Sequence, residues 1–103
     1  MIVGEYIGGL YKRVLPGGKE EWVLHESKIT KIVQNSKGTK VYSKGFYPLD
    51  VDEIESNTKI MEDADNYILV REVVLLNEIV RPKYERWLKW VNENPDKVKS
   101  ILQ

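Results

Sequence analysis

The sequence predicts an α+β fold, in which a twisted antiparallel sheet or small open β-barrel of about five to seven strands carries a C-terminal α-helix packed on it. Residues 1–48 alternate runs rich in β-branched and aromatic residues with glycine-containing turns, which is typical of β-hairpins. Residues 83–94 instead place large apolar side chains at the spacing of one helix face, namely Tyr84, Trp87, Leu88 and Val91. We therefore expect the strands to pack on this helix.

The first part of the chain, 1–48, predicts β-hairpins joined by two turns. In the first turn, 16–19, proline fixes φ and the following glycines accept positive φ. The second turn, 35–38, ends in a glycine suited to the left-handed region. A bend or bulge is expected at Gly8-Gly9. The expected strands are 2–7, 10–15, 21–25, 29–34 and 39–44.

The next segment, 49–66, is an acidic excursion from the sheet. Asp50 and Glu53 have the spacing of a capping box, which predicts a short helical turn over 51–56. A short strand is expected over 58–61. The acidic residues that follow predict a solvated loop.

The last third of the chain predicts one strand and two helices. Residues 67–76 are β-branched and apolar on both sides, which predicts a central strand covered on both faces. Asn77 is expected to cap a helix over 78–94, and a short trailing helix is expected over 96–102. Because no internal repeat or linker divides the chain, we expect 1–103 to be a single domain.

The charge is balanced overall but unevenly distributed. The formal net charge is zero, from 16 Lys and Arg and 16 Asp and Glu residues, and this disfavours a general polyanion-coating protein. Residues 1–48 have a balance of +4 (eight basic, four acidic), 49–66 of −6 (one basic, seven acidic) and 67–103 of +2 (seven basic, five acidic). The sequence therefore predicts a molecule with basic and acidic regions.

The composition also bears on the compartment. The chain contains no cysteine, which excludes disulfides and thiolate metal sites. The first residues include Glu5 and no basic region, so we expect no signal peptide. The apolar stretch near the C-terminal third is interrupted by Arg71 and Glu72, so no membrane span is expected. These features favour a cytoplasmic protein that has no membrane partner.

No group of residues matches a catalytic motif. His25 is the one histidine, and no serine lies in the strand–turn–helix context of a nucleophile. Residues 17–20, Gly-Gly-Lys-Glu, lack the Ser or Thr and the following helix of a phosphate-binding loop, so we interpret them as a hairpin turn. We expect no catalytic residue; the alternative is an enzyme that acts on nucleotides through Tyr, Lys, Arg or Glu side chains.

A cluster of acidic residues raises the question of a metal site. It consists of Asp50, Asp52, Glu53 and Glu55. A calcium loop requires oxygen ligands at alternating positions and a central glycine, whereas Ile54 occupies the next alternate position and no glycine follows. Acidic residues are also favoured at helix N-termini. We interpret the cluster as a helix start, and expect neither a metal nor another cofactor.

The basic hairpins contain the candidate ligand-binding residues. Lys40, Tyr42 and Lys44 alternate, so a strand would place all three on one face. Ammonium groups beside an aromatic ring suit a ligand with phosphates and bases, because the cation meets the phosphate and the ring stacks on the base. The alternative is that these lysines protect an edge strand from aggregation. The candidates are Lys28, Lys31, Lys40, Tyr42, Lys44 and Tyr47.

A second set of residues is a candidate partner interface. On the predicted helix, Trp90 lies off the apolar face and is flanked by Arg86 and Lys89, a composition typical of interface hot spots. The alternative is that Trp90 covers the rim of the sheet. The acidic part of this interface would be Asp50, Asp52 and Glu53. Self-association through the helix or a sheet edge makes a homo-oligomer a further expectation.

Two segments carry a resemblance: Gly-Phe-Tyr-Pro-Leu-Asp-Val at 45–51 and Trp-Leu-Lys-Trp-Val-Asn-Glu-Asn-Pro at 87–95. In these segments and in its short length, the chain resembles small accessory proteins of bacteriophage genomes. The resemblance implies a non-enzymatic binding protein in the host cytoplasm. Such a protein would antagonise a host defence system by sequestering a phosphorylated nucleotide signal or by blocking a defence protein. The alternative function is a nucleic-acid-binding module that uses the Lys/Tyr hairpin face.

Overall fold

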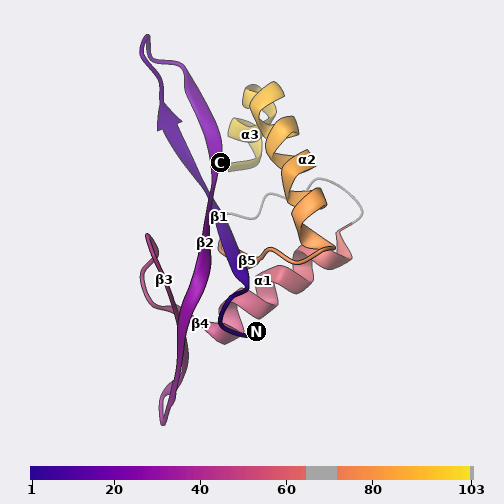
Figure 1. The fold of residues 1–103 in the computed structure, drawn as a ribbon. Coiled ribbons are helices and arrows are strands. Elements are labelled where there is room, and N and C mark those ends of the chain that lie inside the picture. The colour runs from indigo at the N-terminus through magenta and orange to yellow at the C-terminus, as the bar shows by residue number, and fades with distance from the viewer. Residues whose placement is uncertain (65–71, 103) are drawn as a thin grey trace.

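The fold is an antiparallel sheet with three helices, seen in a computed structural model that describes residues 1–64 and 72–102, and at 99, 101 and 102 the backbone alone (Figure 1). The five strands form one curled sheet, a half-barrel, in the order β4-β3-β2-β1-β5. This confirms the predicted α+β class. The elements are β1 (Tyr6–Val14), β2 (Glu20–Asn35), β3 (Gly38–Ser43), β4 (Leu49–Asp50), α1 (Val51–Asp63), β5 (Val74–Leu75), α2 (Val80–Glu93) and α3 (Pro95–Leu102).

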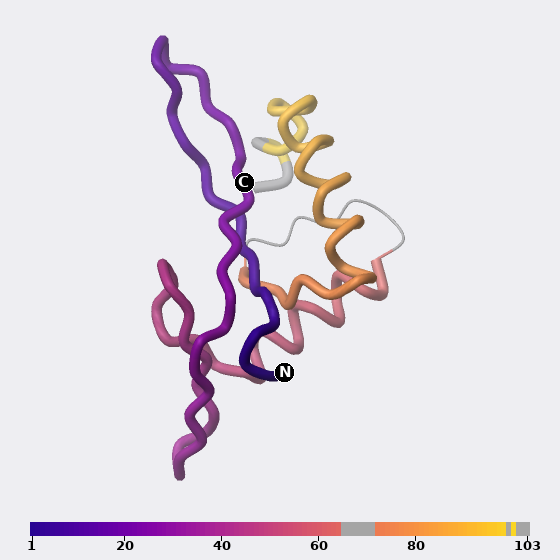
Figure 2. Tube along the Cα trace, in the orientation of Figure 1, coloured from indigo at the N-terminus to yellow at the C-terminus, as the bar shows by residue number. Residues whose placement is uncertain are grey.

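The sheet is dominated by one long hairpin. β2 is 16 residues long and runs the length of the molecule, whose longest dimension is 45 Å (Figure 2). Its first half pairs with β1, and its second half pairs with β3. Both hairpin turns lie where the sequence predicts them, with positive φ at Gly17, Gly18 and Gly38.

The predicted breaks inside these strands are wrong. The sequence predicts a bend or bulge at Gly8-Gly9, but β1 continues through both residues with unbroken register, and β2 replaces two predicted strands. The glycines allow close packing of neighbouring side chains instead. A Cβ atom at Gly8 would lie 2.7 Å from the Leu76 Cδ1 atom and 2.9 Å from the Leu24 Cδ1 atom. Any side chain at position 8 would therefore have to shift the Leu24 and Leu76 side chains that pack over this strand.

The two faces of the sheet have separate hydrophobic clusters. On the face that we call the α1 face, Ile7, Ile29 and Val41 pack with Ile54 of α1. The opposite face, the α2 face, contributes Leu10, Trp22 and Leu24 to a cluster with α2 and α3. Successive residues of a strand point to opposite faces, so each strand supplies side chains to both clusters.

The segment from 49 to 76 differs most from the prediction. α1 extends over 13 residues and includes 58–61, which was wrongly predicted as a strand, and the predicted acidic loop begins within this helix. Hydrogen bonds stabilise the β-branched Thr58 within this helix. Its hydroxyl donates to the Ile54 carbonyl (2.7 Å) and accepts from the Leu75 amide (2.7 Å). The prediction of a central strand over 67–76 is also wrong for the residues of this range that the structure describes. β5 is short and lies at the edge of the sheet. Residues 65–71 of these predictions lie outside the described residues.

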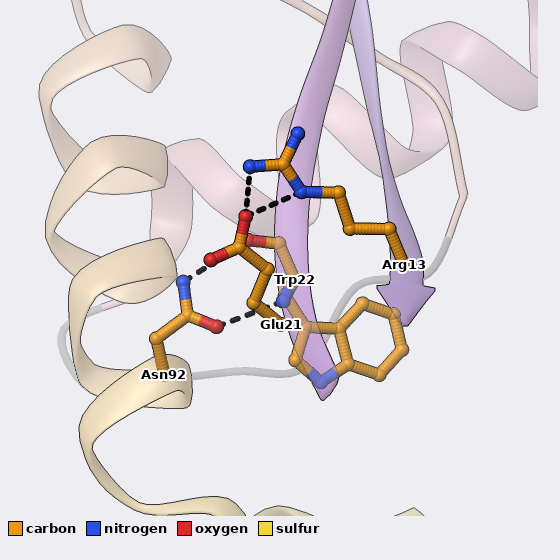
Figure 3. Close-up of polar contacts among 4 residues, drawn as sticks. All are labelled: Arg13, Glu21, Trp22 and Asn92. Atoms are coloured by element: carbon orange, nitrogen blue, oxygen red, sulfur yellow. Dashed lines mark hydrogen bonds and ion pairs between the residues drawn. The ribbon is translucent and has the colours of Figure 1, made fainter. Parts of the chain in front are cut away.

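α2 is fixed at both ends by asparagine side chains. The Asn77 Oδ1 atom accepts hydrogen bonds from the amides of Ile79 (3.0 Å) and Val80 (2.7 Å), as its predicted capping role requires, although α2 begins at Val80, two residues after the predicted start. Near the other end, the Asn92 amide accepts from the Trp22 backbone N–H (2.8 Å) and donates to the Trp22 carbonyl (3.0 Å), beside the Arg13–Glu21 ion pair (Figure 3). α2 is therefore anchored to the sheet edge as well as to its face.

Candidate functional site

A row of basic and aromatic side chains lies on the α2 face, beyond the start of α2. We call it the basic–aromatic strip, and it consists of Tyr6, Lys28, Lys31, Lys40, Tyr42 and Arg81. The strand register defines it, because Tyr6 is the cross-strand partner of Lys28, and Lys31 is that of Tyr42. Side chains directly opposite each other on neighbouring strands interact on the same face.

A β-bulge brings the two halves of the strip to the same face. Lys28 and Lys31 are three residues apart, so a regular strand would point them to opposite faces. The register of β2 against β3 shifts between Ile29 and Lys31, which makes Thr30 the extra residue. The Thr30 hydroxyl donates to the Tyr42 carbonyl at 3.2 Å. With the bulge, both lysines point away from the cluster that contains Ile29.

Two cation–π contacts order the aromatic rings of the strip. The Lys31 Nζ atom lies 5.7 Å from the centroid of the Tyr42 ring, and the Arg81 guanidinium carbon lies 6.0 Å from the centroid of the Tyr6 ring. Both distances are within the range of an attractive contact. Tyr6 is 41% exposed and Tyr42 is 36% exposed, so both rings remain accessible to a ligand.

The strip keeps a net positive charge although two of its cations are in ion pairs. Lys40 pairs with Asp50 at 2.7 Å, and Arg81 pairs with Glu26 at 2.7 Å. The hydrogen bond to Asp50 raises the pKa of Lys40 above its ordinary value of 10.5, so this amine is charged at neutral pH. No ion-pair partner of Lys28 or Lys31 is found within 1–64 and 72–102. These two ammonium groups are therefore available to an anionic ligand.

The predicted ligand-binding residues are only partly brought together. Lys28, Lys31, Lys40 and Tyr42 belong to the strip, and the predicted alternation of Lys40 and Tyr42 on one face is present. Lys44 lies just past the end of β3 and is exposed. Tyr47 lies in the connection between β3 and β4, with 88% of its surface exposed.

The predicted partner interface is split between two places. Asp50, Asp52 and Glu53 lie at the start of α1, whereas the end of α1 meets the start of α2, where Lys83 Nζ donates to the Glu62 carbonyl (Figure 1). The flank of α2 with Arg86, Lys89 and Trp90 is therefore far from the acidic residues. Arg86 and Lys89 are exposed, while Trp90 is half-buried and packs against the α2-face cluster. This packing agrees with the rim-covering alternative for Trp90.

The surroundings of His25 are aromatic. Its ring centroid lies 4.6 Å from that of Phe46 and 6.1 Å from that of Tyr11. A Cβ atom at Gly45 would lie 2.6 Å from the His25 Nε2 atom, so any side chain there would push the imidazole out of its present position. In the part of the chain that the structure covers, no group of three or more His, Cys, Asp or Glu side chains could hold a metal ion. No described helix has the length and apolar character needed to cross a membrane.

Sequence reasoning missed one residue of the strip entirely. Arg81 comes from α2, 55 positions after its ion-pair partner Glu26, and no local pattern connects the two. Tyr6 had a signal, since it is an aromatic residue in a predicted strand, but its pairing with Lys28 depends on the register of the long hairpin.

Comparisons with known proteins find no family model, no curated protein and no solved structure that matches this chain.

Proposed function

We propose that this protein acts by binding rather than by catalysis, and that the basic–aromatic strip binds single-stranded nucleic acid. One observation carries the proposal: cationic and aromatic side chains alternate on one face, with Arg81 over Tyr6 and Lys31 over Tyr42. Proteins that bind single strands combine cations that follow the phosphates with rings on which successive bases stack.

The shape of the strip favours an extended ligand. Its residues come from three strands and the first turn of α2, and none of them lines any of the three hollows described for the molecule. Small ligands usually occupy enclosed sites, whereas a strand can lie along an open face. Sequestration of a nucleotide signal in a host cell, one of the two roles that the resemblance to bacteriophage accessory proteins implies, would use the same phosphate and base chemistry. It would require a second protein surface, such as another copy of the chain, to enclose the ligand.

The binding test measures affinity for a short labelled single-stranded DNA and RNA by fluorescence anisotropy at several salt concentrations. Single-strand binding through two to four cations predicts a slope of log K against log salt of about −1.4 to −2.8. Tyr42→Ala is expected to weaken binding about tenfold, because one stacking contact contributes about 1–3 kcal/mol. Lys31→Ala is expected to weaken binding and to make the salt slope shallower.

Matched controls separate the strip from general surface charge. Tyr47→Ala removes a more exposed tyrosine outside the strip, and Lys89→Ala removes an exposed lysine on α2. Both should bind like the unaltered protein. Equal losses in all four variants would overturn the proposal. Tight stoichiometric capture of a mononucleotide or cyclic nucleotide, together with weak binding of strands, would replace it with the sequestration role.

A further inference from the structure

A hollow lies at the other end of the α2 face, beyond the last turn of α2. It has a volume of about 420 Å³ and is bounded by the β1–β2 turn on one side and by the corner between α2 and α3 on the other. Figure 1 shows this turn and α3 at the opposite end of the molecule from β3 and β4. The hollow is therefore separate from the basic–aromatic strip.

The floor of the hollow is apolar and rigid. Val91 is 1% exposed and Val98 is 3% exposed, and both belong to the α2-face cluster, against which the half-buried Trp22 packs. The Asn92 amide makes two hydrogen bonds to the Trp22 backbone, which fix the strand relative to the helix corner (Figure 3). A ligand would thus meet a preformed surface, which lowers the entropic cost of binding.

Two lysines and one glutamate, Glu20, lie at the rim of the hollow. Lys12 and Lys19 both line it. Lys12 is in an ion pair with Glu20, with 2.6 Å between the Nζ and Oε2 atoms. Lys19 is exposed in the hairpin turn and has no ion-pair partner within the described ranges. Among the described side chains that line the hollow, it is the one cation without an ion-pair partner.

We propose that this hollow binds a small organic anion that carries a flat ring, with the ring against Trp22 and the anionic group on Lys19. The volume is within the range of about 300–1,000 Å³ that is common for small-molecule sites. An indole ring beside the apolar floor, with one available cation among the described side chains of the rim, favours a ligand that has a flat ring and one charged end. Nucleoside monophosphates and aromatic carboxylates share this chemistry.

No local pattern in the sequence predicts this hollow. Gly18 and Lys19 belong to the Gly-Gly-Lys-Glu segment, which lacks the features of a nucleotide-binding loop and does form a hairpin turn. What the sequence does not reveal is that this turn faces the corner of two helices more than 70 residues later. The lysine contributes to a site through tertiary contact, not through a local phosphate-binding loop.

The test is a titration of the full-length protein with adenosine monophosphate, benzoate and inorganic phosphate, followed by isothermal calorimetry and by NMR shifts of the Trp22 indole N–H. One or both ring-bearing anions should bind with one-to-one stoichiometry and shift this signal, while phosphate alone should bind at least about tenfold more weakly because it lacks the ring. Binding of adenosine monophosphate but not of benzoate would identify a nucleotide site. Binding of benzoate but not of adenosine monophosphate would identify a site for aromatic carboxylates.

Two lysine variants make the test specific. Lys19→Ala should weaken binding about tenfold, since a charge-assisted contact is lost. Lys37→Ala, in the turn between β2 and β3, removes another exposed lysine of a hairpin turn and should leave binding unchanged. Circular dichroism would show that both variants are folded. The proposal is overturned if no ring-bearing anion shifts the Trp22 signal, or if Lys19→Ala binds like the unaltered protein. Loss of binding in Tyr42→Ala instead would assign the ligand to the basic–aromatic strip.

Discussion

The two halves of β2 differ in what covers the same face of the strand. In the first half, Trp22 and Leu24 point to the α2 face and pack under α2. In the second half, Lys31 points to the same face, opposite Tyr42, and both side chains are exposed. The border lies near Glu26, which is paired with Arg81 in the first turn of the helix. The chemistry of the face changes where the helix begins.

The side chains on the uncovered half of β2 differ from those of a hydrophobic core that has lost its covering layer. An uncovered sheet face that was meant to be buried would expose apolar side chains, and such patches are costly in a soluble monomer. The bare half of β2 instead presents cations beside tyrosines, which are stable in water and can also stack on a ligand. The covered half provides stability, and the bare half is the part for which we propose a binding function.

The largest effect is expected from placing a lysine on each half of the strand. Leu24→Lys puts a charge under α2 and should lower the free energy of unfolding by about 3 kcal/mol, from lost apolar burial and the desolvation of the amine. Val33→Lys makes the same kind of change on the bare half, opposite Lys40, and should cost less than about 1 kcal/mol. Urea denaturation followed by tryptophan fluorescence measures both values.

The same pair of variants also tests the binding proposal. Val33→Lys adds a cation to the basic–aromatic strip and should raise the affinity for single strands and steepen its salt dependence. Leu24→Lys should leave the affinity unchanged under conditions in which the protein is still folded. If both variants were equally destabilised, the distinction between a covered and a bare half of β2 would be wrong.

The sequence predicted the helix face and the hairpin turns because these features depend on local patterns. Tyr84 and Trp87 are 0% and 2% exposed, as their helical spacing predicts, and the turn glycines have positive φ. Burial raises the pKa of Tyr84 well above its usual range, so this phenol stays neutral.

The strand breaks were mispredicted, since glycine in a sequence can indicate either a bend or a close approach of another layer. At Gly8 the second reason applies, and it depends on Leu76, 68 positions later.

The candidate site could be predicted only in part for a similar reason. The alternation of Lys40 and Tyr42 is a local property and was predicted. The position of Lys31 depends on the bulge at Thr30, and the contribution of Arg81 depends on how α2 docks. α1 was predicted too short because its isoleucine, threonine and asparagine residues have weak helix propensity. Packing of Ile54 and Met61 into the two clusters stabilises the helix instead.

An intermediate effect is expected at the asparagine that holds the covered half in place. Asn92→Ala removes both hydrogen bonds to the Trp22 backbone and should lower the free energy of unfolding by about 1 kcal/mol, because water can replace part of the interaction at this exposed position. Asn35→Ala removes a hydrogen bond from the Lys37 amide within the β2–β3 turn and should cost less, since it links neighbouring residues only. Thermal denaturation measures both losses of stability. An equal loss in Asn92→Ala and Asn35→Ala would contradict the anchoring role of Asn92.

The smallest effect is expected from the ion pair at the edge of the bare half. Asp50→Asn removes the carboxylate that pairs with Lys40 and should raise the affinity for single strands about twofold, because exposed pairs of this kind contribute little. The raised pKa of Lys40 gives the pH dependence: the pair's contribution to stability is complete below the ordinary lysine pKa of 10.5 and is lost as the pH rises through the raised value. Binding to the strip should therefore not vary with pH through the titration of Lys40 between neutral pH and mildly alkaline conditions. A loss of affinity in Asp50→Asn, measured by anisotropy at neutral pH, would mean that Asp50 orients Lys40 toward the ligand instead of competing with it.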